Sequence, residues 1–325
     1  MYAVLRANIT LGDYIFKQIN EVVIDRSVDT LSDTATIKMP TSFLLGNEDK
    51  GFTRQKLDKA IKPGDEVVIV LMYEGIIEKQ EFMGYVKKIK PTIPMEIECE
   101  DAIYLIRKRK LNKLFVNAKL VDVLEYIVAG TGVKLSTVIP AMQLDRFLLK
   151  DVNGAKALQT IKEEFGLAIY IDDDGKLFAG LKQQLNAINK VEYHFQRNVI
   201  SNDLEFTNEE DVSLRVKAIG IAPDNTRITV EVGDTEGEER TLHFYNISDK
   251  AKLTELANAE LLKLKYTGYK GSLTSFLEPD CDRGWSADIV DGNYPEKSGT
   301  YFVESTQVTY SDAGARRVVT LGVKL

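Results

Sequence analysis

The pattern of apolar and polar positions divides the chain into three blocks. In the first block, roughly residues 1–105, apolar and polar residues alternate over 34–39 and 93–100, and residues 66–73 form an apolar, β-branched run. A period of two is typical of a half-buried strand. Residues 41–62 lack this period, so we expect a long loop with a short helix there. The pattern predicts a small antiparallel β-barrel or sandwich.

The second block, about residues 106–200, changes to a helical period. Apolar side chains recur at helical spacing over residues 120–128, with Asn117 as the expected N-cap, and again over residues 158–165. A hairpin follows, with its turn at Asp172–Gly175, because Asp and Gly tolerate positive φ. This block is predicted to be mixed α+β.

The third block, residues 201–325, returns to the period of two. Alternation over residues 212–218 and 228–232 predicts strands, and further strands are expected towards the end of the chain. One apolar stripe over residues 253–264 predicts a single inserted helix. A second β-barrel is the simplest interpretation.

A faint internal repeat links the first and third blocks. Gly64 precedes a strand and is followed eighteen residues later by Phe82, and Gly284 and Phe302 have the same spacing. In both blocks the aromatic residue opens a strand, and an alternating strand then closes the block. We interpret this order as a duplicated β domain. The predicted fold is mainly β (α+β overall), with two similar antiparallel β-barrel domains flanking a mixed domain: residues 1–105, 106–200 and 201–325.

Composition limits the function. The 42 Lys and Arg residues against 49 Asp and Glu residues give a net charge of −7, which disfavours a general nucleic-acid binder. The sequence has no run of 18 apolar residues, so we expect no transmembrane helix and no membrane insertion. Its N-terminus lacks the apolar core of a secretory signal.

Few residues are available for catalysis or metal binding. The chain has two cysteines, Cys99 and Cys281, and two histidines, His194 and His243, and none lies in a metal-binding or nucleophile motif. The triplet Asp172–Asp174 lacks the spaced ligands and terminal Glu of an EF-hand, so we interpret it as a hairpin turn. We expect no catalytic centre, no metal site and no cofactor.

Two charged segments are candidate interaction sites. The polar side of the alternating strand 93–100 carries Glu96, Glu98 and Glu100, for which strand periodicity is a simpler explanation than a glycosidase pair. A dense basic run is either a docking patch for an acidic partner or DNA, or a solvated domain boundary. The run comprises Arg107, Lys108, Arg109 and Lys110.

Four stretches of the sequence resemble a known protein family. They are VVIDRSVDTLSDTATIKMP; IKPGDEVVIV with EFMGYVKKIKP; ALQTIKEEFGLAIYIDDDGKLF; and GTYFVESTQVTYSDAGARRVVTLGV. In this order they resemble the phage tail baseplate hub of the late control protein D type, found in Mu-like and other contractile tails. The resemblance covers most of the chain, but segments 41–62 and 233–239 have no counterpart.

The resemblance implies a structural protein rather than an enzyme. In such hubs two tube-like β-barrels flank a mixed insert, and three copies form a ring that adapts a six-fold tail tube to a three-fold spike. The expected partners are copies of the chain itself, the tail tube or tape-measure end, a spike that is a separate polypeptide, and baseplate wedge proteins. DNA would only pass through the channel. The expected location is the virion tail baseplate, with assembly in the host cytoplasm.

An acidic channel suits this role, because like charge keeps DNA from adhering to the wall. Glu96, Glu98 and Glu100 are the candidates to line it. The alternative function is a β-rich cell-wall hydrolase or carbohydrate-binding protein. A single Trp and the lack of a convergent carboxylate or Cys/His site disfavour that alternative.

Overall fold

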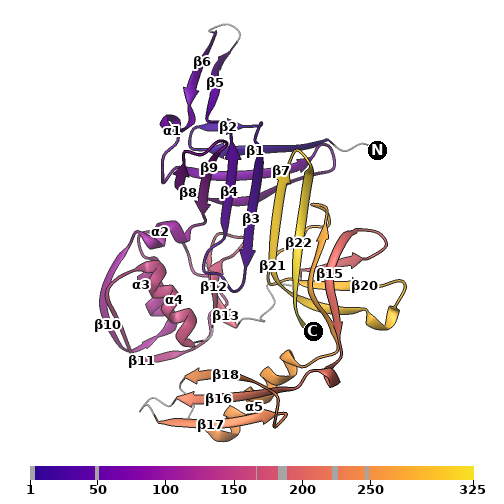
Figure 1. Cartoon of the computed structure of the whole chain (residues 1–325). Helices are drawn as coiled ribbons and strands as arrows, with labels where there is room; N and C mark the ends of the chain where they lie inside the picture. The colour runs from indigo at the N-terminus through magenta and orange to yellow at the C-terminus, as the bar shows by residue number, and fades with distance from the viewer. Residues whose placement is uncertain (1–3, 48–50, 166, 182–188, 222–225, 246–248) are drawn as a thin grey trace.

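The computed structural model describes residues 4–325 except 48–50, 166, 182–188, 222–225 and 246–248 (Figure 1). Strands make up 55% of the structure and helices 17%, which confirms the prediction of a mainly β fold. Among the described residues, no helix combines the length and apolar character needed to span a bilayer.

The elements follow the three blocks. The first block contains β1 (Leu5–Leu11), β2 (Tyr14–Phe16), β3 (Glu21–Ser27), β4 (Thr34–Met39), β5 (Ser42–Asn47), β6 (Gly51–Lys56), α1 (Leu57–Ala60), β7 (Glu66–Tyr73), β8 (Ile77–Lys90), β9 (Met95–Glu100) and α2 (Ile103–Arg107). The middle block contains β10 (Lys110–Lys119), α3 (Leu120–Val128), β11 (Gln143–Asn153), α4 (Gly154–Phe165), β12 (Leu167–Ile171) and β13 (Leu177–Leu181). The third block contains β14 (Lys190–His194), β15 (Val199–Thr207), η1 (Glu209–Asp211), β16 (Leu214–Ile221), β17 (Arg227–Gly233), β18 (Glu238–Tyr245), α5 (Lys250–Leu264), β19 (Gly268–Ser275), β20 (Ser286–Val290), η2 (Pro295–Lys297), β21 (Gly299–Ser311) and β22 (Gly314–Lys324).

Local sequence explains most of these elements. On β4 and β9, for example, Ile37 lies opposite Ile97 and both are fully buried, as the period of two predicts. Helix α3 begins one turn later than expected. Its N-cap is Lys119, and Asn117 has a left-handed φ of 49° within β10.

The expected loop over residues 41–62 is instead the hairpin β5–β6 followed by α1, so that prediction was wrong except for the short helix. The hairpin projects away from the rest of the molecule (Figure 1). A projecting hairpin has little core to cover, so its sequence need not alternate between apolar and polar residues. This explains why a pattern-based prediction missed it.

The main sheet joins the first and third blocks. Its strands follow the order β15-β19-β22-β21-β3-β4-β9-β8-β7-β1-β2, with β20 and β14 attached beside β21. The two blocks meet where β21 pairs with β3 through seven residue pairs, from Ser305 opposite Ser27 to Ser311 opposite Glu21. No closed barrel is formed by the described strands, and the expected arrangement of two separate barrels is not seen in the single chain.

The same strand order occurs in both halves of this sheet. In the first block the neighbours are β3-β4-β9-β8-β7-β1, and in the third they are β15-β19-β22-β21-β20-β14. Each series therefore uses its strands in the same permutation of chain order. One pairing differs, since β1 is antiparallel to β7 whereas β14 is parallel to β20.

The two glycines of the sequence repeat occupy equivalent positions. Gly64 has a φ of 100° and donates its N–H to the carbonyl of Val86 at 2.8 Å, while Gly284 has a φ of 79° and donates to Val303 at 2.9 Å. The aromatic residues are not equivalent. Phe302 lies opposite Ser286, two residues after Gly284, but the residue two after Gly64 lies opposite Tyr85 rather than Phe82.

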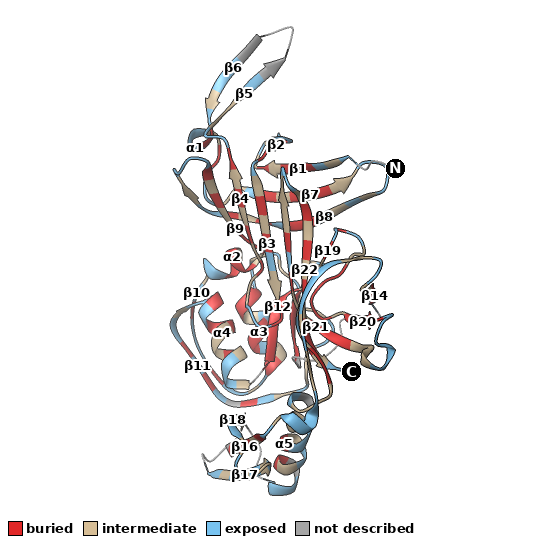
Figure 2. Cartoon of the chain, turned by 45° about the vertical axis from the view of Figure 1, so that its right-hand side comes forward, coloured by how far each residue is buried: buried red, intermediate tan, exposed pale blue. Residues whose placement is uncertain are grey.

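Separate apolar cores support the parts of the molecule. One lies under the first-block strands, a second packs α3 and α4 against β10–β13, and a third lies within the third block. The insertion β16–β18 with α5 has its own small core around Val216 and Leu253. In Figure 2 this insertion hangs below the main sheet, and α5 keeps an exposed outer side.

Candidate functional site

One face of the main sheet is polar across both blocks, and we call it the polar sheet face. Residues directly opposite each other on neighbouring strands share a face of a sheet. The register therefore places the following residues together: Glu21, Asp25, Thr34, Thr36, Lys38, Glu96, Glu98, Ser272, Thr274, Gln307, Thr309, Val318 and Thr320. A hollow lined by Asp25, Thr34, Gln307 and Thr320 lies where the two blocks meet. The face is suited to contact water or a polar partner.

The three predicted acidic residues divide into two groups. Glu96 and Glu98 lie on the polar sheet face, and both pair with Lys90, with a distance of 2.6 Å between its Nζ and a Glu96 oxygen. The Lys90 ammonium donates a hydrogen bond to Glu98 and lowers the pKa of that carboxyl. Glu100 is fully buried and pairs with Arg107, so its side chain does not reach the surface of the single chain.

Most of the basic run is engaged within the chain. Arg107 pairs with Glu100, and Arg109 donates hydrogen bonds to the carbonyls of Tyr126 and Ile127 at 2.5 and 2.9 Å, where a cation also favours the C-terminal end of α3. The Lys108 ammonium lies 4.1 Å from the centre of the Tyr104 ring. Lys110, at the start of β10, is exposed.

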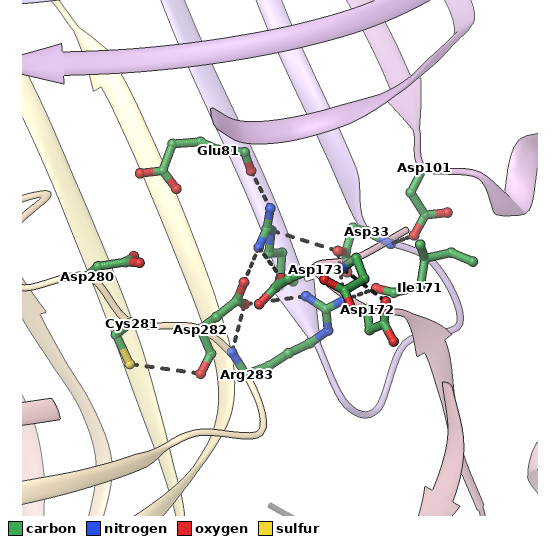
Figure 3. A network of polar contacts seen from close by, with 12 residues as sticks. Asp33, Glu81, Asp101, Ile171, Asp172, Asp173, Asp280, Cys281, Asp282 and Arg283 are labelled. Atoms are coloured by element: carbon green, nitrogen blue, oxygen red, sulfur yellow. Dashed lines mark hydrogen bonds and ion pairs between the residues drawn. The ribbon is translucent and has the colours of Figure 1, made fainter. Parts of the chain in front are cut away.

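A buried ionic junction lies where the three blocks meet (Figure 3). Arg283 pairs with Asp33 at 2.9 Å and with Asp282 at 3.4 Å, and its side chain is only 2% exposed. Arg283 also donates to the carbonyl of Ile171 in the middle block at 2.5 Å. Arg26 of β3 pairs with Asp282 and, at 3.3 Å, with Asp173 of the β12–β13 turn. The junction thus joins the third block to both other blocks.

A second buried pair reinforces the contact between the first and third blocks. The guanidinium of Arg317 on β22 lies 2.8 Å from the Glu81 carboxylate on β8, and both side chains are at most 3% exposed. Arg317 also donates to the carbonyl of Cys281 at 3.0 Å. Buried ions of this kind are stable only when each is paired and hydrogen-bonded.

The junction perturbs its carboxyl groups unequally. Burial raises the pKa of Asp33 to about 6, although Arg283 and Arg26 oppose the shift. Burial and the neighbouring Asp33 raise the pKa of Asp101 well above its ordinary value, and Asp33 donates its backbone N–H to Asp101 at 2.8 Å. Burial also acts to raise the pKa of Asp282, but Arg26 and Arg283 hold it below its usual range. The junction therefore combines ionised and readily protonated carboxyls.

Sequence reasoning did not find this junction. The Asp172–Asp174 triplet forms the predicted hairpin turn, with the Gly175 N–H donating to the Asp172 carbonyl at 2.9 Å, but Asp173 also reaches Arg26. The only available signal was the Asp-Cys-Asp-Arg stretch at 280–283, which breaks the strand pattern between β19 and β20. No cluster of His, Cys, Asp or Glu within the described ranges has the geometry of a metal site.

The sequence matches no protein-family model, and comparison with curated proteins finds no relative. Solved structures do match over nearly the whole chain. The 43 kDa tail protein of prophage MuSo2 from Shewanella oneidensis has a TM-score of 0.64 at 15% identity, covering 97% of each chain. The tail protein from Neisseria meningitidis MC58 has a TM-score of 0.67 at 13% identity, covering 99% of this chain and 97% of that one.

A third structure extends the similarity to secretion systems. An E. coli component of the type VI secretion system, described as structurally similar to T4 bacteriophage tail proteins gp27 and gp5, has a TM-score of 0.57 at 10% identity. The match covers 94% of this chain and 73% of that chain. The fold is therefore that of phage tail proteins, which confirms the family resemblance at the level of the fold. These neighbours are tail and secretion-system components, in agreement with a structural protein rather than an enzyme.

Proposed function

We propose that this chain is a structural subunit of the baseplate hub of a contractile phage tail or a phage-derived injection device. Three copies would form a ring that adapts a six-fold tail tube to a three-fold spike. The observation that carries the proposal is the repeated strand order of the first and third blocks, within a fold shared with phage tail proteins. Two similar halves per subunit give a three-fold ring six similar positions.

The proposed domains are residues 1–105 and 201–325 as the repeated units and residues 106–200 between them. Within one chain, the seam between the units is the pairing of the second half of β21 with β3. The equivalent elements on the other side of each unit are the second half of β8 and strand β15. Within the described residues, the outer edge of β15 has no strand partner, and Lys87–Lys90 of β8 pair only with β9.

Unpaired edges of this kind favour pairing with another chain. The free edge of β8 carries the exposed side chains of Lys87 and Lys88, whereas β15 carries the exposed Asp203 and Glu205. These opposite charges favour a head-to-tail contact in which β8 of one copy meets β15 of the next. Such a contact uses different surfaces on the two copies, so repeating it three times closes a ring. The barrels missing from the single chain would be completed by this closure.

The polar sheet face would then line the channel, with Glu96 and Glu98 as its acidic residues. We place the subunit in the virion tail baseplate after assembly in the host cytoplasm. It would contact the tail tube or tape-measure end, a spike protein and baseplate wedge proteins. DNA would only pass through the channel. A face of hydroxyl, amide and partly neutralised carboxylate groups suits transient passage, because it offers no cluster of free cations for phosphates.

Mass measurement of the full chain in solution tests the proposal, first alone and then with the spike protein encoded beside it. We expect trimers in at least one of the two conditions, with a central pore in electron micrographs. A chain that stays monomeric in both conditions, or forms an even-numbered closed assembly, would contradict the ring.

A further inference from the structure

The β10–β11 ribbon has an apolar outer face that the fold leaves uncovered. Side chains on its inner face, such as Phe115 and Phe147, are 6% exposed and pack on α3 and α4. On the outer face Leu114, Val116 and Leu148 are 45%, 61% and 56% exposed. Large exposed aliphatic side chains grouped on one strand pair often indicate a binding surface.

The register makes this outer face continuous. Leu114 lies directly opposite Leu148, and Val116 lies directly opposite Arg146. In Figure 1 the ribbon is at the periphery, with α3 and α4 between it and the rest of the molecule. The patch therefore faces away from the body, on elements that a rigid core holds in place.

Basic side chains surround the apolar centre. Lys110, Arg146 and Lys150 are exposed, and none of them has an ion-pair partner among the residues that the structure describes. Asp151 is the exposed acidic residue beside Lys150 on β11. This patch, rather than the neighbouring run 107–110, holds the free basic groups of the middle block, because Arg107 and Arg109 are engaged internally.

We propose that the outer face of β10–β11 binds a segment of a different polypeptide that presents apolar side chains between carboxylates. Charge complementarity selects this partner, since an acidic segment would pair with the basic rim while its apolar residues cover the leucines. Two copies of this face would bring like charges together, so a second copy of the chain is disfavoured. The site lies outside the proposed ring contacts and stands independently of the ring.

The test uses the full chain and a fluorescent synthetic peptide in which glutamate alternates with valine and leucine. A matched peptide carries lysine in place of glutamate. We expect the acidic peptide to bind and the basic one not to, with affinity decreasing at high salt. The double variant Arg146→Glu/Lys150→Glu should bind at least about tenfold more weakly, a loss of about 1.4 kcal/mol, and Leu114→Ser/Leu148→Ser should also weaken binding.

Leu262→Ser is the control, because Leu262 is 73% exposed but lies on α5, away from the ribbon. It should bind like the unmodified chain. Equal binding of both peptides, no binding of either, or full binding by the charge variant would overturn the proposal. A change of solution mass in the Leu114→Ser/Leu148→Ser variant would assign the face to contacts between copies instead. Thermal melting of each variant separates lost binding from lost folding, and the mass of the unmodified chain tests the ring separately.

Discussion

Arg317 and Glu81 form a buried ion pair at 2.8 Å between the last strand, β22, and the first-block strand β8. The pair links two units that share a sheet only through the β21–β3 seam, so it adds a second, side-chain connection between them. Removing one charge would leave the other buried and uncompensated.

We therefore predict that Arg317→Met lowers the free energy of unfolding by about 3 to 5 kcal/mol. The double variant Arg317→Met/Glu81→Met should recover part of this loss, since neither charge then remains buried. Urea denaturation followed by circular dichroism measures both. Arg6→Ala is the control, because the Arg6–Glu74 pair is more than half exposed, and it should cost less than about 1 kcal/mol. Similar losses for Arg6→Ala and Arg317→Met would contradict the prediction.

The raised pKa of Asp33 predicts a pH dependence of stability. Because burial raises its pKa to about 6 from the ordinary value of 3.8, the folded chain binds this proton more tightly than the unfolded chain. The contribution is therefore fully present below pH 3.8 and is lost as the pH rises through about 6. We expect Asp33→Asn to remove a decrease of the order of 2 kcal/mol over this window.

Denaturation midpoints at pH 4, 5, 6 and 7 measure this effect as a difference between variant and unmodified chain. Loss of the Asp33–Arg283 contact lowers the stability of the variant at every pH, so the slope is the informative quantity. Asp13→Asn, at the exposed turn before β2, controls for the removal of a carboxylate. Parallel curves for Asp33→Asn and the unmodified chain would refute the assignment.

The acidic strand should separate into two classes when it is mutated. Glu100→Gln should lower the free energy of unfolding by about 3 kcal/mol, because the fully buried carboxylate is paired with Arg107. Glu96→Gln and Glu98→Gln should leave the melting temperature unchanged, since their side chains lie on the polar sheet face. If these two residues line a DNA channel, the double variant should form particles that deliver DNA less efficiently in a plaque or transduction assay. Unchanged delivery would remove them from the channel.

The proposed contact between copies predicts a rescue by charge reversal. Lys87→Glu/Lys88→Glu should weaken trimer formation, because the β8 edge would then repel Asp203 and Glu205 on β15. Combining it with Asp203→Lys/Glu205→Lys should restore the trimer. Sedimentation velocity measures each species. Reversal of Lys59, on the short helix α1, is the control and should leave assembly unchanged. Failure of the combined variant to restore a trimer that both single-edge variants lose would reject this pairing.

Much of the fold could be predicted where the sequence alternates. Strand β4 has the predicted bounds, and β7 and β9 lie within the predicted ranges, because each has one face on a core and one on solvent. The β5–β6 hairpin was missed because its projecting strands lack that contrast. The repeat was recognised from two glycines whose backbone geometry is indeed equivalent, yet the matching aromatic spacing was a coincidence. An irregularity between Ile69 and Val70 of β7 shifts the register so that Phe302 corresponds to Tyr85.

The interaction sites were harder to predict, because charge in a sequence does not show burial. Glu100 follows the same alternation as Glu96 and Glu98, but α2 and its Arg107 cover it. Arg107 and Arg109 are similarly used inside the fold. The junction of Arg26, Asp33 and Arg283 depends on contacts between residues more than 250 positions apart, for which no local pattern exists.

The β21–β3 seam also sets the order in which the molecule can be built. Gln307 donates a hydrogen bond to Asp25 across 282 positions of sequence. During synthesis the first-block strands leave the ribosome long before β21 exists, so β3 waits with one edge unsatisfied. Contacts of such long range slow folding, and a waiting edge is an opportunity for wrong partners. A nascent chain of this topology would therefore benefit from a chaperone that shields β3 until translation is finished.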